Sequence, residues 1–148
     1  MSLLQSLVRS YACRCSKRNW TSTPMNMMTN AAAPVTKLGG SPRFSAIATH
    51  NGLVHLAGQV SQLEDGDIAA QSRDVFAKVD ALLAEAGAAR ENLISVQIWL
   101  REMEDYDGMN AVWDDWVSDI TPPTRVCVEA RMAKPHYRIE VLALAAIG

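Results

Sequence analysis

The chain has little of what marks secreted, fibrous or membrane-spanning proteins. Its 148 residues include three cysteines, eight glycines and six prolines, which excludes collagen-like and low-complexity chains. Cys13 and Cys15 lie near the start without a histidine cluster, so they are a poor metal-site pattern, and the rest of the chain holds only Cys127. No apolar run approaches the roughly 18 residues that a transmembrane helix needs. We therefore predict one globular domain in a reducing compartment, with no membrane association.

Several catalytic signatures are also missing. The sequence has no G-x-G-x-x-G, no Walker loop and no G-x-S-x-G, so dinucleotide, nucleoside triphosphate and serine-hydrolase chemistry have no support. His50, His55 and His136 are scattered and lack the spacing of metal ligands. We therefore interpret the three histidines as structural rather than as metal ligands.

Acidic residues are absent from the first part of the chain. Residues 1–63 carry six cations and no anion, whereas residues 64–148 carry eight cations and sixteen anions, a net charge of −8. The acidic part argues against nucleic-acid binding, because phosphate contacts need clustered cations. The first part is rich in Ser, Thr and Asn and places leucines beside arginines at helical spacing, which is typical of a mitochondrial transit peptide.

We therefore predict residues 1–34 as a mitochondrial presequence that directs the protein to the matrix, and residues 35–148 as the folded domain. A disordered basic tail on a cytoplasmic protein and a secretory signal remain alternatives. The secretory signal is the least favoured, because Gln5, Ser6 and Arg9 interrupt its apolar block.

The hydrophobic periodicity from Pro42 onward predicts alternating strands and helices. His50-Asn51-Gly52 joins strand-like runs over 43–49 and 53–57, a strong hairpin signal. Residues 67–86 form an amphipathic helix with Asp67 as N-cap and Gly87 beyond its end. The remaining predicted elements are a strand over 93–100, a helix over about 103–117, a strand from Thr124 and a last strand over 137–146.

This order, ββαβαββ, predicts an α+β fold in which both helices cover one face of a mixed sheet, a two-layer sandwich. In the strand over 93–100, Ile94 shares the buried face with Val96, Ile98 and Leu100, and Trp99 lies on the other face. We expect a second subunit to cover that other face. Trp99, Trp113 and Trp116 are interpreted as core and interface packing rather than as a stacking platform.

Two side chains are candidates for chemistry. Arg125 follows Pro122-Pro123 at the start of a strand, where a guanidinium can hold a carboxylate by two points, although a surface ion pair is the alternative. Glu140 interrupts an apolar strand, where a carboxylate can position water or, alternatively, act as the structural partner of an arginine. Cys127 shares the face of Arg125 and is more typical of a small half-buried thiol than of a nucleophile.

These residues belong to a longer pattern. The segments P-T-R-V-C-V-E-A-R at 123–131 and Y-R-I-E-V at 137–141 resemble the C-terminal signature of the Rid family, the reactive intermediate deaminases also called YjgF or L-PSP. V-H-L-A-G-Q-V at 54–60 resembles its second strand and glycine loop, and M-N-A-V-W at 109–113 resembles its second helix. The resemblance runs from about Pro42 to the C-terminus.

The resemblance implies a chorismate-mutase-like fold, a homotrimer with a cleft at each subunit interface, and no cofactor. It implies hydrolysis of enamine or imine intermediates such as 2-aminoacrylate and 2-iminobutyrate to 2-keto acids and ammonia. Arg125 matches the arginine that grips the substrate carboxylate, and Glu140 matches the glutamate that positions water. Cys127, Asn110 and Gly58 match substrate-binding positions, the first through its backbone.

Two positions depart from the common family pattern. Phe44, at a substrate-binding position, replaces a tyrosine, and Ala57 replaces a serine, so two hydroxyls are missing. The departures point to a divergent subgroup with altered rate or substrate preference. Two other functions remain open, namely a non-catalytic trimer that binds small carboxylates or a partner, and an endoribonuclease or translation inhibitor.

Overall fold

The computed structural model describes residues 33–147, so nearly all of the predicted presequence lies outside the described residues. The strands are β1 (Thr36–Leu38), β2 (Ile47–His50), β3 (Leu53–Leu56), β4 (Gln59–Val60), β5 (Leu93–Leu100), β6 (Thr124–Glu129) and β7 (Ile139–Ala146). The α-helices are α1 (Ile68–Glu85) and α2 (Tyr106–Trp116), and short 3₁₀ turns precede β5 and α2 at Arg90–Asn92 and Met103–Asp105.

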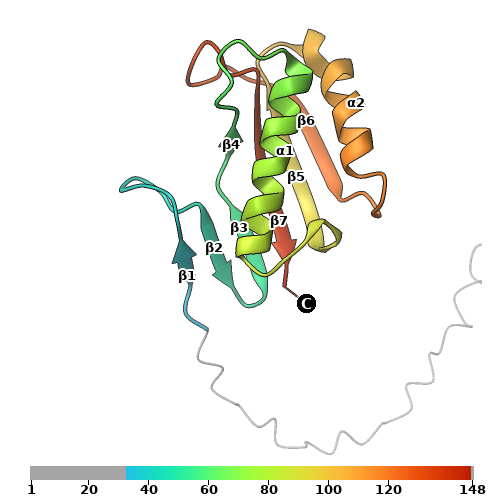
Figure 1. Ribbon diagram of the computed structural model, residues 1–148. Helices are drawn as coiled ribbons and strands as arrows, with labels where there is room; N and C mark the ends of the chain where they lie inside the picture. The colour runs from blue at the N-terminus through green and yellow to red at the C-terminus, as the bar shows by residue number, and fades with distance from the viewer. Residues whose placement is uncertain (1–32, 148) are drawn as a thin grey trace, which may run out of the picture. The chain divides into compact units, whose positions relative to one another are not determined.

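All these strands belong to one mixed sheet with the order β1-β2-β3-β7-β5-β6, and the short β4 pairs with the first part of β7 (Figure 1). Only β5 and β6 are parallel, and α2 connects them; the other pairs are antiparallel. The predicted order ββαβαββ is confirmed. The sequence reading missed β1 and β4, which are short, and all three residues of β1 are exposed, so that strand has no alternating burial pattern.

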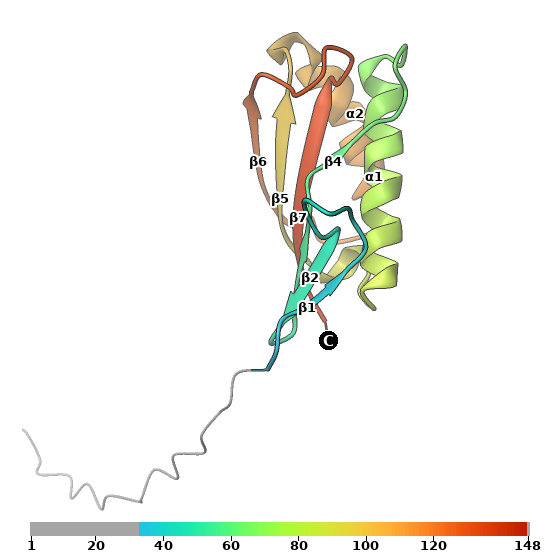
Figure 2. The ribbon, with the colours of Figure 1, turned by 90° about the vertical axis from the view of Figure 1, so that its left-hand side faces the viewer.

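Both helices lie on the same side of the sheet (Figure 2), so the α+β two-layer arrangement is confirmed. The core fills the space between the layers. From β7 it takes every second residue, each fully buried: Ile139, Val141, Ala143 and Ala145. From α1 it takes an apolar stripe: Val75, Phe76, Val79 and Leu83.

No helix of the described residues covers the opposite sheet face, which we call the open face. It carries the alternate residues of β7, including Leu142 and Leu144, together with Trp99 of β5, and all three are half-buried. On the edge strand β6, Val126 and Val128 are exposed by 49% and 43%. The predicted uncovered apolar face is thus present; the homotrimer itself stays a prediction.

The predicted hairpin is confirmed at its turn but begins later than expected. Asn51 and Gly52 both have positive φ, as the tight turn between His50 and Leu53 requires. Residues 43–45 are not part of the first strand, because Ser41 and Phe44 pair their backbones in a separate small turn. This turn holds Phe44 between β1 and β2.

The strand β5 departs from strict alternation at its start. Its pairing with β7 shifts between Leu93 and Ser95, so Leu93 rather than Ile94 points into the core, and Ile94 is 41% exposed. The prediction that Ile94 lies on the buried face is therefore wrong. A bulge inserts an extra residue that a local pattern of apolar and polar residues does not reveal.

The helix α1 begins and ends where the sequence predicts. The carboxylate of Asp67 accepts a hydrogen bond from the amide of Ala70 at 2.7 Å, and Gly87 takes positive φ beyond the C-terminus of the helix.

Within residues 33–147, no helix has the length and apolar character that crossing a membrane requires.

Candidate functional site

Arg125 lies at the start of β6, directly after the proline pair that ends the connection from α2. The hydroxyl of Thr124 anchors this point by donating to the carbonyl of Ile94 at 2.9 Å. In the parallel register Arg125 stands opposite Val96, which is buried under the helices. The side chain of Arg125 therefore lies on the helix face of the sheet.

Three side chains of α2 surround the half-buried guanidinium of Arg125. Its Nη1 donates to Oδ1 of Asn110 at 2.8 Å, and its Nη2 lies 3.5 Å from the hydroxyl of Tyr106. Its Cζ lies 4.9 Å from the ring centroid of Trp113, a cation–π distance. The structure thus brings together Arg125 and Asn110, both of them predicted site residues. The sequence did not single out Tyr106 and Trp113 as site residues. With Asn110 between them, they occupy positions i and i+7 of α2, which is also the spacing of an ordinary apolar helix stripe.

No carboxylate among residues 33–147 forms an ion pair with Arg125. A guanidinium has five N–H donors, and Asn110 and Tyr106 accept from two of them. A partly desolvated cation with unused donors favours an anion as its partner, and the planar donor edge matches a carboxylate.

Cys127 follows Arg125 by two residues on β6, so its side chain lies on the same helix-covered face, where it packs against the core. Burial raises the pKa of its thiol, and the nearby charge of Arg125 only partly opposes this. A thiol with a raised pKa is mostly protonated at neutral pH and is a weak nucleophile. This agrees with a role for the backbone of Cys127 rather than for its sulfur.

Glu140 lies on the other sheet face. It stands opposite Trp99 in the antiparallel register, on the open face, and is half-buried rather than embedded in the core. Its carboxylate lies against Gly58, where an added Cβ would come within 3.1 Å of Cδ and closer still to Oε1. Gly58 and Glu140, both predicted site residues, are thus in contact.

A hydrogen-bonded cluster ties the strand after Gly58 to α1. Oδ2 of Asp74 accepts from Ser61 Oγ at 2.7 Å, from the amide of Gln62 at 3.1 Å and from Lys78 Nζ at 2.9 Å. Lys78 also donates to the carbonyl of Val60 at 2.9 Å. Burial acts to raise the pKa of Asp74, but these hydrogen bonds outweigh it and lower the pKa.

A second cluster holds the segment that leads into β7. The buried Asp105 pairs with Arg138, whose Nε donates to Oδ2 at 2.9 Å, and this bond raises the pKa of Arg138. The amide of the fully buried Gln71 donates to the carbonyls of Leu63 and His136 and accepts from the amide of Arg138. Glu140 follows two residues later, so its strand starts from a fixed point.

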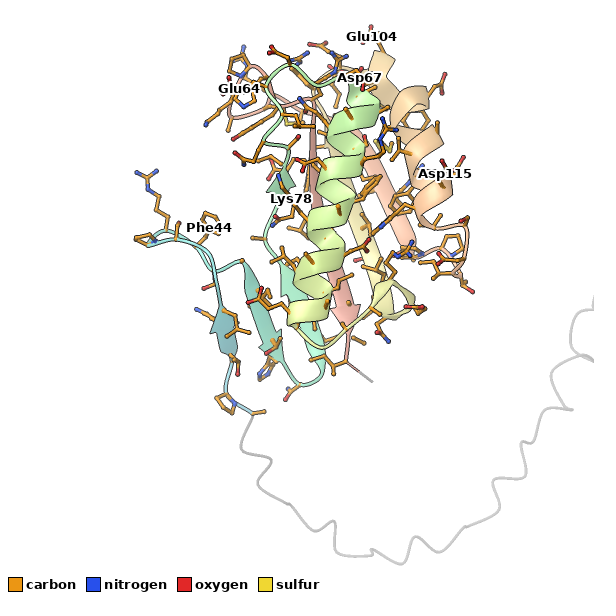
Figure 3. All side chains as sticks on the ribbon, viewed as in Figure 1. Phe44, Glu64, Asp67, Lys78, Glu104 and Asp115 are labelled. Carbon is orange, nitrogen blue, oxygen red and sulfur yellow. The ribbon has the colours of Figure 1, made fainter. Side chains whose placement is uncertain are left out.

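The two groups of predicted residues do not meet within one chain. The strand β5 lies between β6, which carries Arg125, and β7, which carries Glu140, and the two side chains lie on opposite faces of the sheet. Phe44 is 56% exposed on the turn between β1 and β2, at the far edge of the sheet from β6 (Figure 3). We call Arg125, Asn110, Tyr106 and Trp113 the arginine group, and Glu140 with Gly58 the glutamate group; Phe44 is assigned to neither.

Among residues 33–147, one cluster of carboxylates has oxygens close enough together for a cation. Glu102, Glu104 and Glu129 bring theirs within 4.8 Å of one another, and all three are exposed. Glu129 accepts a hydrogen bond from the amide of Met103 at 3.0 Å. The cluster includes no residue of the arginine or glutamate groups.

Comparison with known proteins gives consistent matches. The family model described as Endoribonuclease L-PSP matches residues 35–147. A RutC family protein from Haemophilus influenzae is 39% identical over 106 residues, which are 71% of this chain and 91% of that protein. A solved member of the YjgF protein family from Neisseria meningitidis is 40% identical with a TM-score of 0.73, and the match covers 76% of this chain and 94% of that one. A structure of an uncharacterized protein from Pseudomonas aeruginosa, 35% identical, has a TM-score of 0.75 over 78% of this chain.

Proposed function

The chain belongs to the endoribonuclease L-PSP family, also called Rid or YjgF, and on this basis we propose that it hydrolyses reactive enamine and imine intermediates. The substrates are small 2-imino or 2-enamino acids such as 2-iminobutyrate and 2-aminoacrylate, and the products are 2-keto acids and ammonia. The reaction adds water across the C=N bond of the imine and then releases ammonia, so it needs no oxidant or cofactor.

The observation that carries this proposal is the half-buried Arg125, which has no carboxylate partner among the described residues. In a 2-imino acid the carboxylate is bonded to the electrophilic carbon. A guanidinium that fixes the carboxylate by two points therefore also fixes the position at which water must attack. Glu140 is the carboxylate that positions and activates this water.

Because Arg125 and Glu140 lie on opposite faces of the sheet, they can act on one substrate only if they come from two chains. We propose a homotrimer in which the open face of each subunit packs on its neighbours and each cleft combines one arginine group with one glutamate group. The apolar character of the open face supports this assembly, since a monomer would leave Trp99, Leu142 and Leu144 without cover.

The deciding experiment is an assay with 2-aminoacrylate and 2-iminobutyrate generated in situ, following keto-acid release against spontaneous hydrolysis. Release accelerated by the wild-type chain and lost in Glu140→Gln is the expected result. Equal release with and without the protein would contradict the proposal.

A second candidate function follows from the family description, which names an endoribonuclease. The acidic residues of the domain favour the deaminase over it, because RNA backbones need clustered cations. Incubation of the same preparation with single-stranded RNA tests this alternative. Carboxylate binding without either activity would instead identify a non-catalytic binding trimer.

We also propose that residues 1–34 direct the protein to mitochondria, on the basis of their cations and the absence of acidic residues. A fusion of residues 1–35 to a fluorescent reporter in a eukaryotic cell is expected to localise to mitochondria. A reporter that stays in the cytoplasm would contradict this targeting.

A further inference from the structure

Arg125 is held by more side chains than the family resemblance accounts for. The resemblance points to Arg125 and Asn110, yet Tyr106 and Trp113 contact the same guanidinium from the same face of α2. Arg125 forms no ion pair with a carboxylate among residues 33–147. The contacts of Tyr106 and Trp113 therefore do not serve to hold a salt bridge in place.

Trp113 restricts the orientation of the guanidinium. Its ring is 5% exposed and is itself fixed by Phe76 and Trp116, at centroid distances of 5.8 and 5.4 Å. Phe76 and Trp116 are in turn stacked at 4.7 Å. A guanidinium placed over a ring that cannot turn loses its own freedom to rotate, so a bound carboxylate meets donors that are already oriented.

Tyr106 offers a donor that no described residue uses. Its hydroxyl oxygen lies 3.5 Å from Nη2 of Arg125, a long contact, and none of residues 33–147 accepts a hydrogen bond from its O–H. A carboxylate oxygen has several lone-pair sites and can accept from the guanidinium and from this hydroxyl together. The chain thus carries a hydroxyl beside its arginine, although Phe44 and Ala57 lack the hydroxyls of the common family pattern.

We propose that Arg125, Tyr106 and Trp113 form one carboxylate receptor, in which Tyr106 is a substrate-binding residue and Trp113 is a positioning residue. The identity of the substrate rests on the proposed function, but the receptor itself is tested by binding alone. The ligand class is a small 2-oxo or 2-imino carboxylate.

The test measures the dissociation constant of 2-oxobutyrate, an unreactive keto-acid product, by calorimetry on the full chain. Tyr106→Phe removes only the hydroxyl and is expected to weaken binding about threefold to tenfold. Tyr137→Phe is the matched control, because Tyr137 contacts His136 rather than Arg125. Tyr106→Phe and Tyr137→Phe with equal dissociation constants would overturn the role of Tyr106.

Trp113→Leu is expected to weaken binding about tenfold, and Trp113→Phe, which keeps a ring under the cation, to recover most of it. Trp116→Leu removes an indole from the same aromatic cluster without touching Arg125, so it controls for lost packing. Equal binding by Trp113→Leu and Trp116→Leu would overturn the positioning role. If Trp113→Leu does not fold, Trp113→Met replaces it, because it also removes the ring but keeps a longer apolar side chain. Binding by that variant as tight as by the wild type would overturn the positioning role.

Kinetics separate this receptor from the proposed function. In the keto-acid assay Tyr106→Phe is expected to raise KM more than it lowers kcat, because the contact is made before and during reaction. A wild-type chain that binds 2-oxobutyrate through Tyr106 but releases no keto acid would refute the deaminase and leave the receptor standing. A wild-type chain that binds no 2-oxobutyrate would overturn the receptor.

Discussion

The arginine group and the glutamate group are built in different ways. Arg125 is enclosed by one face of α2, whose residues 106, 110 and 113 supply a hydroxyl, an amide and a ring. Glu140 lies on the open face against Gly58, and Phe44 lies exposed at the far sheet edge. In the proposed assembly, the chain completes the carboxylate receptor by itself, and another copy encloses the half that positions water.

The largest effect is expected from a charge on the open face. Leu144→Glu places a carboxylate in the proposed interface, where burial without a partner is costly, and should convert trimers into monomers without activity. Ala84→Glu, which adds the same charge at an exposed position of α1, should leave the assembly unchanged. Sedimentation of the wild type and both variants, each without residues 1–34, measures the oligomeric state. A wild-type monomer at micromolar concentration would contradict the two-chain cleft.

Arg125→Lys tests the receptor half. Lysine keeps the charge but loses the planar donor edge and the stacking on Trp113, so activity should fall on the order of 10²-fold or more while the fold stays intact. Cys127→Ser should have a mild effect, because its thiol has a raised pKa and only its backbone is assigned a role. Full activity in Arg125→Lys together with loss in Cys127→Ser would favour a thiol mechanism instead.

Gly58→Ala tests the other half. The added Cβ would occupy the position of the Glu140 carboxylate and displace it, so we expect a loss of activity of about tenfold with little change in binding of 2-oxobutyrate. The same substitution in a Glu140→Gln background should cost nothing further, since the group that it displaces is already inactive. Additive losses would show that Gly58 acts independently of Glu140.

The smallest effect concerns the cluster that anchors β4. The pKa of Asp74 is lower in the folded chain than in the unfolded chain, so its contribution to the free energy of unfolding is present above the unfolded pKa of about 3.9 and is lost as pH falls through the folded pKa. Asp74→Asn should cost about 1 kcal/mol at pH 7 and progressively less in acid. Thermal unfolding of Asp74→Asn measures this loss of stability, and Asp114→Asn, at an exposed position of α2, is the control. A difference in stability between Asp74→Asn and the wild type that is as large in acid as at pH 7 would contradict this role of the Asp74 carboxylate.

Local patterns were enough to predict the order of the main elements. Asn51-Gly52 specified the hairpin turn, and Asp67 and Gly87 marked the ends of α1, because each signal depends on the backbone of a few adjacent residues. The bulge before Ser95 was not predictable in this way, since it depends on how β5 pairs with β7. The short β1 has no buried residue that would mark it as a strand.

The family pattern named candidate site residues but not their arrangement in space. Arg125, Asn110, Gly58 and Glu140 were identified from the family pattern, and two contacts among them are present. The separation of Arg125 from Glu140 depends on β5 lying between their strands, which is a long-range pairing. Trp113 was assigned to the core because its helix spacing is the same whether or not a cation lies over the ring.

The claim that each cleft joins two chains is tested most directly by mixing two inactive variants. Arg125→Lys keeps an intact glutamate group and Glu140→Gln keeps an intact arginine group, so trimers assembled from an equal mixture should regain about a quarter of wild-type activity. Each variant assembled alone should remain inactive. A mixture of assembled trimers with no more activity than the separate variants would show that both groups serve a site within one chain, and would contradict this account.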